Sequence, residues 1–146
     1  MELYDFPNRD SWDKRRVWLD RVIDERCIGG YDVSEQAAAL TLELQNIFCC
    51  GAWHTVIILS VAIVDAHFRD VERPDHKGST ADLVKQIGFK SDFEWLRKKR
   101  NKLVHIDVTN PIASLDDYLL KKEALEEEAK KAIEIVFDAL FMFPHI

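Results

Sequence analysis

The residues best suited to chemistry lie between Trp95 and His105. Five of the six residues from position 97 to position 102 are basic, in a chain whose formal net charge is -6. A local positive field of this kind attracts phosphate groups, and such cations position a nucleic-acid backbone without reading its bases. A solvated helix end, where cations offset the helix dipole, is the alternative explanation. The cations concerned are Arg97, Lys98, Lys99 and Lys102.

Arg100, Asn101 and His105 stand out within this cluster because their side chains suit work on a phosphodiester. On a helix, Asn101 and His105 lie one turn apart on the same face. Arg100 lies about 140° from His105 around a straight helix, so these two do not share a face. They converge either if His105 lies in a loosened last turn or if two copies of the helix meet across a two-fold axis.

The segment from Arg100 to His105 resembles the motif of the HEPN superfamily (higher eukaryotes and prokaryotes nucleotide-binding). That motif is an arginine followed, after four to six residues, by a histidine, often with a polar residue directly after the arginine. Here four residues intervene and Asn101 takes the polar position. The order of helices over about residues 36–141 also resembles the family. A second match, Arg69 to His76, is rejected because Pro74 breaks the helix between them.

The resemblance implies a homodimer whose two motifs face each other in a cleft, and metal-independent cleavage of RNA in the active members. His105 would take the proton of a ribose 2′-OH, because an imidazole exchanges protons near neutral pH. Arg100 would stabilise the extra charge on the phosphorane. Asn101 would hold a phosphate oxygen or orient His105. Attack by the 2′-OH restricts the reaction to RNA, mainly in single-stranded regions.

Three functions follow from these residues. The first is a ribonuclease with no cofactor, as the toxin of a toxin–antitoxin or antiphage pair, with an antitoxin or nucleotidyltransferase as partner. The second is a non-catalytic module of the same family that binds a nucleotide or a partner protein. The third is a helical adaptor whose basic patch docks an acidic surface. His105 would then merely bond the last carbonyls of its helix.

Asp65 is expected to support this site. It follows nine mostly apolar residues, so it faces the interior and needs a partner. Arg100 is one candidate, and the pairing would hold its guanidinium in place. A hydroxyl or backbone group is the other candidate.

The elements that position these residues are all helical. Apolar residues recur at helical spacing, and Ser11, Thr80, Ser91 and Ser114 together with Asp32-x-x-Glu35 supply start signals. The pattern predicts an all-α antiparallel bundle of five or six helices in a single domain, with residues 1–30 as an N-terminal helix and 31–146 as the bundle core. The expected helices cover about residues 11–27, 32–51, 52–72, 80–88, 92–105 and 114–141.

Composition excludes several other classes. With 146 residues, 47% of them hydrophobic, the chain can bury a core without a metal or disulfide. Its three cysteines form no C-x-x-C pair, and no histidine spacing suits zinc, so no metal site is expected. Met1–Asp5 lacks the basic and apolar regions of a signal peptide. The most apolar stretch, 56–64, is too short to span a membrane, so we expect a cytoplasmic protein.

Overall fold

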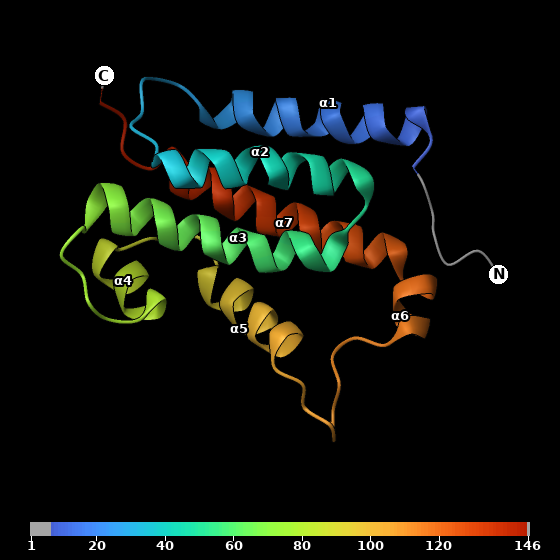
Figure 1. Ribbon diagram of the computed structural model, residues 1–146. Helices are drawn as coiled ribbons and strands as arrows, with labels where there is room; N and C mark the ends of the chain where they lie inside the picture. Colours follow the sequence, from blue (N-terminus) through green and yellow to red (C-terminus); the bar gives the residue numbers. More distant parts are fainter. Residues whose placement is uncertain (1–6, 146) are drawn as a thin grey trace.

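The computed structural model describes residues 7–145, and within that range the chain is all-α (Figure 1). It contains seven α-helices and one π-helical turn, and no strand occurs among these residues. The prediction of an all-α bundle is confirmed, whereas the expectation for Met1–Asp5 concerns residues outside the described range. The elements are α1 (Arg9–Arg26), α2 (Glu35–Cys50), α3 (Trp53–His67), η1 (Phe68–Glu72), α4 (Thr80–Ile87), α5 (Phe93–Val104), α6 (Leu115–Leu120) and α7 (Lys122–Leu140).

α3 occupies the centre of the bundle, where it packs against α2, α5 and α7. Val56, Ile63 and Val64 on this helix are fully buried. The hydroxyl of Ser60, also buried, donates to the carbonyl of Val56 at 2.6 Å, so its polar group is satisfied inside the core. α1, α2 and α3 run antiparallel in turn, while α7 lies alongside α3 in the same direction (Figure 1).

The last predicted helix, 114–141, is divided into α6 and α7 at Lys121. Lys121 has φ −114° and ψ 32°, outside the helical region. Neither glycine nor proline marks this break, so the sequence pattern favours a continuous helix. The contact that accompanies the break is tertiary, because the hydroxyl of Tyr118 on α6 donates to the carbonyl of Gly51 at 3.4 Å. This division gives seven α-helices where five or six were expected.

α3 ends in the π-helical turn η1. The amide of Arg73 donates to the carbonyl of Phe68 at 2.9 Å, which is the i→i+5 bond of a π turn. Phe68 itself is fully buried. Pro74 follows the turn, and the predicted end of this helix at Glu72 is confirmed.

The chain leaves the body of the bundle after α5. Residues 105–114 form a long connection that projects away from the other helices before the chain returns at α6 (Figure 1). Within residues 7–145, no helix is both long and apolar enough to cross a bilayer.

Candidate functional site

α5 carries the candidate site and is anchored at its first turn. The carboxylate of Asp92 caps the helix by accepting a hydrogen bond from the amide of Trp95 at 3.3 Å. Lys131 on α7 donates to the same carboxylate at 3.0 Å and lies 4.1 Å from the centre of the Trp95 ring. Phe93 and Leu96 are buried on the side of the helix that faces the bundle. The opposite side of α5 is therefore directed to solvent.

Arg100 lies one turn beyond Leu96 on the inner side of α5 and is half-buried. Its Nε donates to Oδ1 of Asn101 at 2.9 Å. Within the described part of the chain it forms no ion pair. The charge of Arg100 is therefore held in place by an amide that does not neutralise it, which leaves the guanidinium able to bind an anion.

His105 is the first residue after α5 and is exposed. Its backbone is extended, with φ −123° and ψ 109°, which ends the helix, and convergence of its side chain with Arg100 stays a prediction. Its amide donates to the carbonyl of Asn101 at 3.0 Å. Asn101 thus contacts both other residues of the motif, Arg100 through its side chain and His105 through its backbone.

The four cations expected to bind phosphate differ in how far they are free to do so. Arg97 donates to the carboxylate of Glu94 at 3.1 Å, and Lys99 donates to Glu128 at 2.8 Å. Lys98 lies 4.0 Å from Glu94 and is largely exposed, and Lys102 is exposed and makes no ion pair with any described residue. A phosphate would therefore compete with carboxylates for Arg97 and Lys99, whereas Lys98 and Lys102, one turn apart, are available to it.

Asp65 pairs with Arg69 and not with Arg100. One carboxylate oxygen lies 2.7 Å from Nη2 of Arg69 and accepts a second hydrogen bond, also at 2.7 Å, from the hydroxyl of Thr80. The Thr80 hydroxyl matches the second alternative, the pairing with Arg100 is wrong, and the ion pair with Arg69 was not expected. The reason is chain direction: Asp65 lies near the end of α3, whereas α5 runs toward the end where α3 begins (Figure 1).

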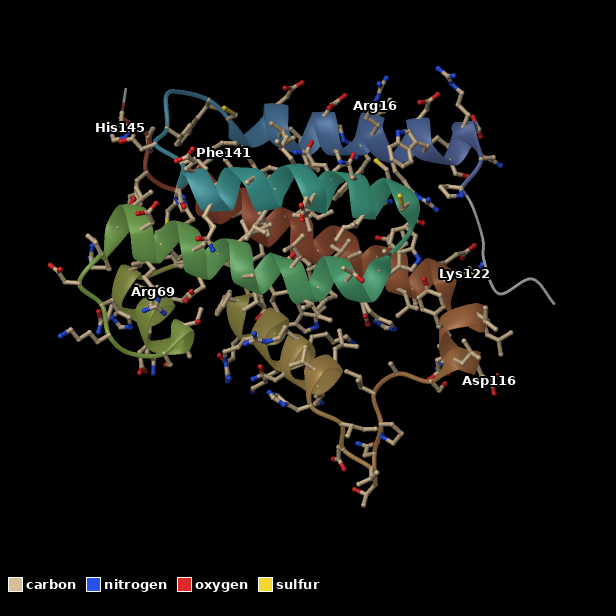
Figure 2. All side chains as sticks on the ribbon, viewed as in Figure 1. Arg16, Arg69, Asp116, Lys122, Phe141 and His145 are labelled. Carbon is tan, nitrogen blue, oxygen red and sulfur yellow. The ribbon has the colours of Figure 1, made fainter. Side chains whose placement is uncertain are left out.

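Arg69 joins Asp65 to the loop before α4, and we call this set of contacts the clamp. Besides its pair with Asp65, Arg69 donates to the carbonyls of His76 at 3.1 Å and Gly78 at 3.4 Å. Figure 2 shows Arg69 between the end of α3 and α4. The clamp therefore fastens the loop before α4 to the central helix, away from the basic cluster of α5.

Replacing Asp65 with asparagine is expected to reduce the free energy of unfolding by about 1–2 kcal/mol at neutral pH, because the charged bond to Arg69 is lost. Burial raises the pKa of Asp65, but the hydrogen bonds from Arg69 and Thr80 outweigh it, so the pKa is lowered overall. The stabilisation is thus complete above the pKa of the unfolded chain, about 3.9, and is lost as the pH falls through the lower value of the fold. Urea unfolding at neutral and acid pH measures both effects. An unchanged difference between the two proteins in acid would contradict this account.

One group near α5 was not predicted from the sequence. The ring of His54, in the first turn of α3, lies 5.6 Å from the ring of Tyr118. Burial lowers the pKa of His54, Glu128 opposes this shift, and Lys99 adds to it. His54 is a single histidine in an apolar helix and belongs to no sequence motif, so the sequence gave no reason to expect a functional role for it.

No group of three or more histidine, cysteine, aspartate or glutamate residues among residues 7–145 is placed to hold a metal ion. Comparison with protein-family models, with curated proteins and with solved structures returned no match to this chain. Any argument for function therefore depends on the residues of α5 themselves.

Proposed function

We propose that this chain is a HEPN-like endoribonuclease that cuts single-stranded RNA without a metal ion. The observation that supports this most directly is the position of Asn101, whose side chain binds Arg100 and whose carbonyl binds the amide of His105. The Asn101 side chain thereby holds Arg100, a cation with no carboxylate partner in the described chain, while the imidazole of His105 is exposed at the end of the same helix. These are the two groups that transphosphorylation of RNA requires.

The reaction uses the 2′-OH of the substrate as its nucleophile. His105 removes the proton of that hydroxyl, and the oxygen forms a bond to the adjacent phosphorus. The bond from phosphorus to the 5′-oxygen breaks, and the leaving oxygen takes up a proton from water. The hydroxide that this leaves accepts the proton held on His105, so the products are a 2′,3′-cyclic phosphate and a free 5′-hydroxyl. Arg100 lowers the barrier because its N–H groups meet the charge that builds on the equatorial oxygens.

Substrate binding would use the solvent-facing side of α5. Lys98 and Lys102 lie on the face of α5 opposite Arg100, so they neutralise phosphates of the strand away from the cleaved bond, and neither reads a base. Duplex RNA holds its backbone in one helical geometry, whereas a single strand lets the 2′-oxygen line up with the leaving oxygen. We infer that the chain acts as a homodimer, with the two motifs sharing one cleft.

The proposal predicts that cleavage of a single-stranded RNA continues in excess EDTA and stops when the ribose at the cut site is replaced by deoxyribose. Deoxyribose lacks the 2′-OH that acts as the nucleophile, so the reaction cannot start at that position. Gel analysis of end-labelled RNA, with mass spectrometry to detect the cyclic phosphate, measures both results.

Two outcomes would contradict the ribonuclease. Binding of RNA or nucleotide without any cleavage would favour the non-catalytic module of the same family. Cleavage that EDTA abolishes would assign the chemistry to a metal ion and remove the role proposed for His105.

A further inference from the structure

The groove between α4 and α5 has an apolar floor that is open to solvent. Its volume is about 700 Å³, within the usual size range of small-molecule pockets. Val84 on α4 and Phe93 on α5 are buried, and Phe89, in the connection between the two helices, is half-buried. All three side chains line the groove. The groove therefore offers apolar surface that includes one aromatic ring within reach of a ligand.

Phe89 is held in place by the end of α4. Gly88 adopts the left-handed conformation, with φ 77°, and its amide donates to the carbonyl of Lys85 at 3.2 Å. The amide of Phe89 donates to the carbonyl of Val84 at 3.3 Å, which completes a Schellman motif. The ring of Phe89 meets the buried ring of Phe68 edge-on, with 5.3 Å between their centres. Backbone and core together fix this ring, so binding a flat ligand costs it little conformational freedom.

The charges along the groove favour an anionic ligand. Lys85 and Lys90 line it, are exposed and form no ion pair with any residue between positions 7 and 145. Two of the three carboxylates that line the groove are already paired, Asp92 with Lys131 and Glu94 with Arg97. Among the unpaired groups, two cations thus face one carboxylate, that of Asp82, and the local field is positive.

The groove continues along α5 toward the motif. Arg97 lines the groove, and Asn101 lies one helical turn further on the same side of α5. His105 follows at the end of the helix, about 12 Å from Arg97 along the helix axis. A strand that follows this side of α5 away from the motif therefore enters the groove.

We propose that this groove holds one base of the single-stranded RNA near the cleaved bond, with the base stacked on Phe89 and its phosphate bound by Lys85 and Lys90. Proteins that bind single strands combine aromatic rings with flanking cations in this way. A base must leave its helix to enter the groove, so duplex RNA does not fit. The inference rests on the proposed function in taking RNA as the ligand.

Replacing Phe89 with leucine is expected to weaken the binding of single-stranded RNA about tenfold, because the stacking ring is lost while apolar volume remains. The probe is a fluorescent 2′-O-methyl RNA of mixed sequence, which has no free 2′-OH and is not cleaved. Anisotropy titration measures its Kd, and circular dichroism verifies that the variant is folded. Phe89→Tyr keeps the ring and should bind as the wild type does. The matched control is Phe143→Leu, since Phe143 is 43% exposed beyond α7 and outside the groove.

Replacing both Lys85 and Lys90 with glutamine is expected to weaken the same binding several-fold and to reduce its dependence on salt. Each phosphate contact to a single strand contributes about 0.7 to the slope of log Kd against log salt, so the slope should fall by about 1.4. Lys14→Gln is the control, because Lys14 is exposed on α1, across the bundle from α4 (Figure 1). The control should keep the wild-type slope.

Polyglutamate tests whether the groove takes an acidic peptide instead. It has negative charges but no bases, so it should bind more weakly than RNA, and Phe89→Leu should not affect it. Polyglutamate that binds as tightly as RNA and displaces it overturns the proposal. An RNA affinity unchanged by Phe89→Leu and by the double lysine variant also overturns it. RNA that is bound through these residues but never cleaved contradicts the ribonuclease and supports the groove as a binding site, so the two failures are distinct.

Discussion

Replacing His105 with alanine is expected to lower the rate of RNA cleavage by about 10²–10⁴-fold, the range for loss of a general base. Affinity for RNA should change little, because Lys98 and Lys102, the exposed cations proposed to bind phosphate, remain. His105 is exposed and follows the last residue of α5, so its side chain can be shortened without opening the core. Single-turnover cleavage and filter binding separate the two quantities.

A second histidine supplies the control for this experiment. His145 is also exposed, but it lies beside Asp32, at 2.6 Å, far along the chain from α5. His145→Ala should cleave RNA at the wild-type rate. Added imidazole should partly restore the His105 variant, because the missing group is a diffusible base. Undiminished cleavage by His105→Ala would remove this residue from the mechanism and leave Arg100 without its partner.

Replacing Phe48 with alanine is expected to reduce the free energy of unfolding by about 3–5 kcal/mol, the largest stability effect anticipated for a single substitution. Phe48 on α2 is fully buried, with ring centres of Trp18 and Trp53 at 5.2 and 5.6 Å. Its removal leaves a cavity between three helices and ends both aromatic contacts. Because folded domains are stable by only about 5–15 kcal/mol, part of the variant should be unfolded at physiological temperature.

Leu42→Ala on the same helix is the control, because it removes a similar side chain from solvent-exposed surface. Leu42 is 67% exposed, so the change in stability should stay within about 0.5 kcal/mol. Chemical denaturation of both variants gives the comparison. It requires that the unfolding free energy falls with denaturant concentration at the same slope in both. Equal stabilities of the two variants would show that Phe48 is not part of a packed core.

The sequence predicts the helices well where capping signals and periodicity agree. α5 was expected over about residues 92–105 and spans Phe93–Val104, with the cap at Asp92 in place of Ser91. α1 was expected from Ser11 and begins at Arg9, because Asn8 is the capping residue and Ser11 supplies the capped amide. Such shifts occur because neighbouring polar residues compete for the same cap, and only the folded backbone decides between them.

Features that depend on distant contacts could not be predicted from the sequence. The partner of Asp65 was ambiguous because sequence spacing does not show which end of α3 the motif helix approaches. The break at Lys121 has no glycine or proline, and it is accompanied by a long-range hydrogen bond from Tyr118 to Gly51. The exposure of Ile106 and Val108 could not be predicted either, because apolar residues in a connection between helices can be buried or exposed.

The π-helical turn after α3 makes the length of that segment critical. A π turn accommodates one residue more than an α turn. Deleting a single residue between Phe68 and Glu72 would remove that extra residue, so ordinary α-helical bonding would form and the chain that follows would keep nearly the same orientation. Inserting a residue would instead rotate the chain that follows by about 100° around the helix axis and carry Thr80 away from Asp65, so the loop before α4 would lose its fastening. An insertion and a deletion are therefore not equivalent at this turn.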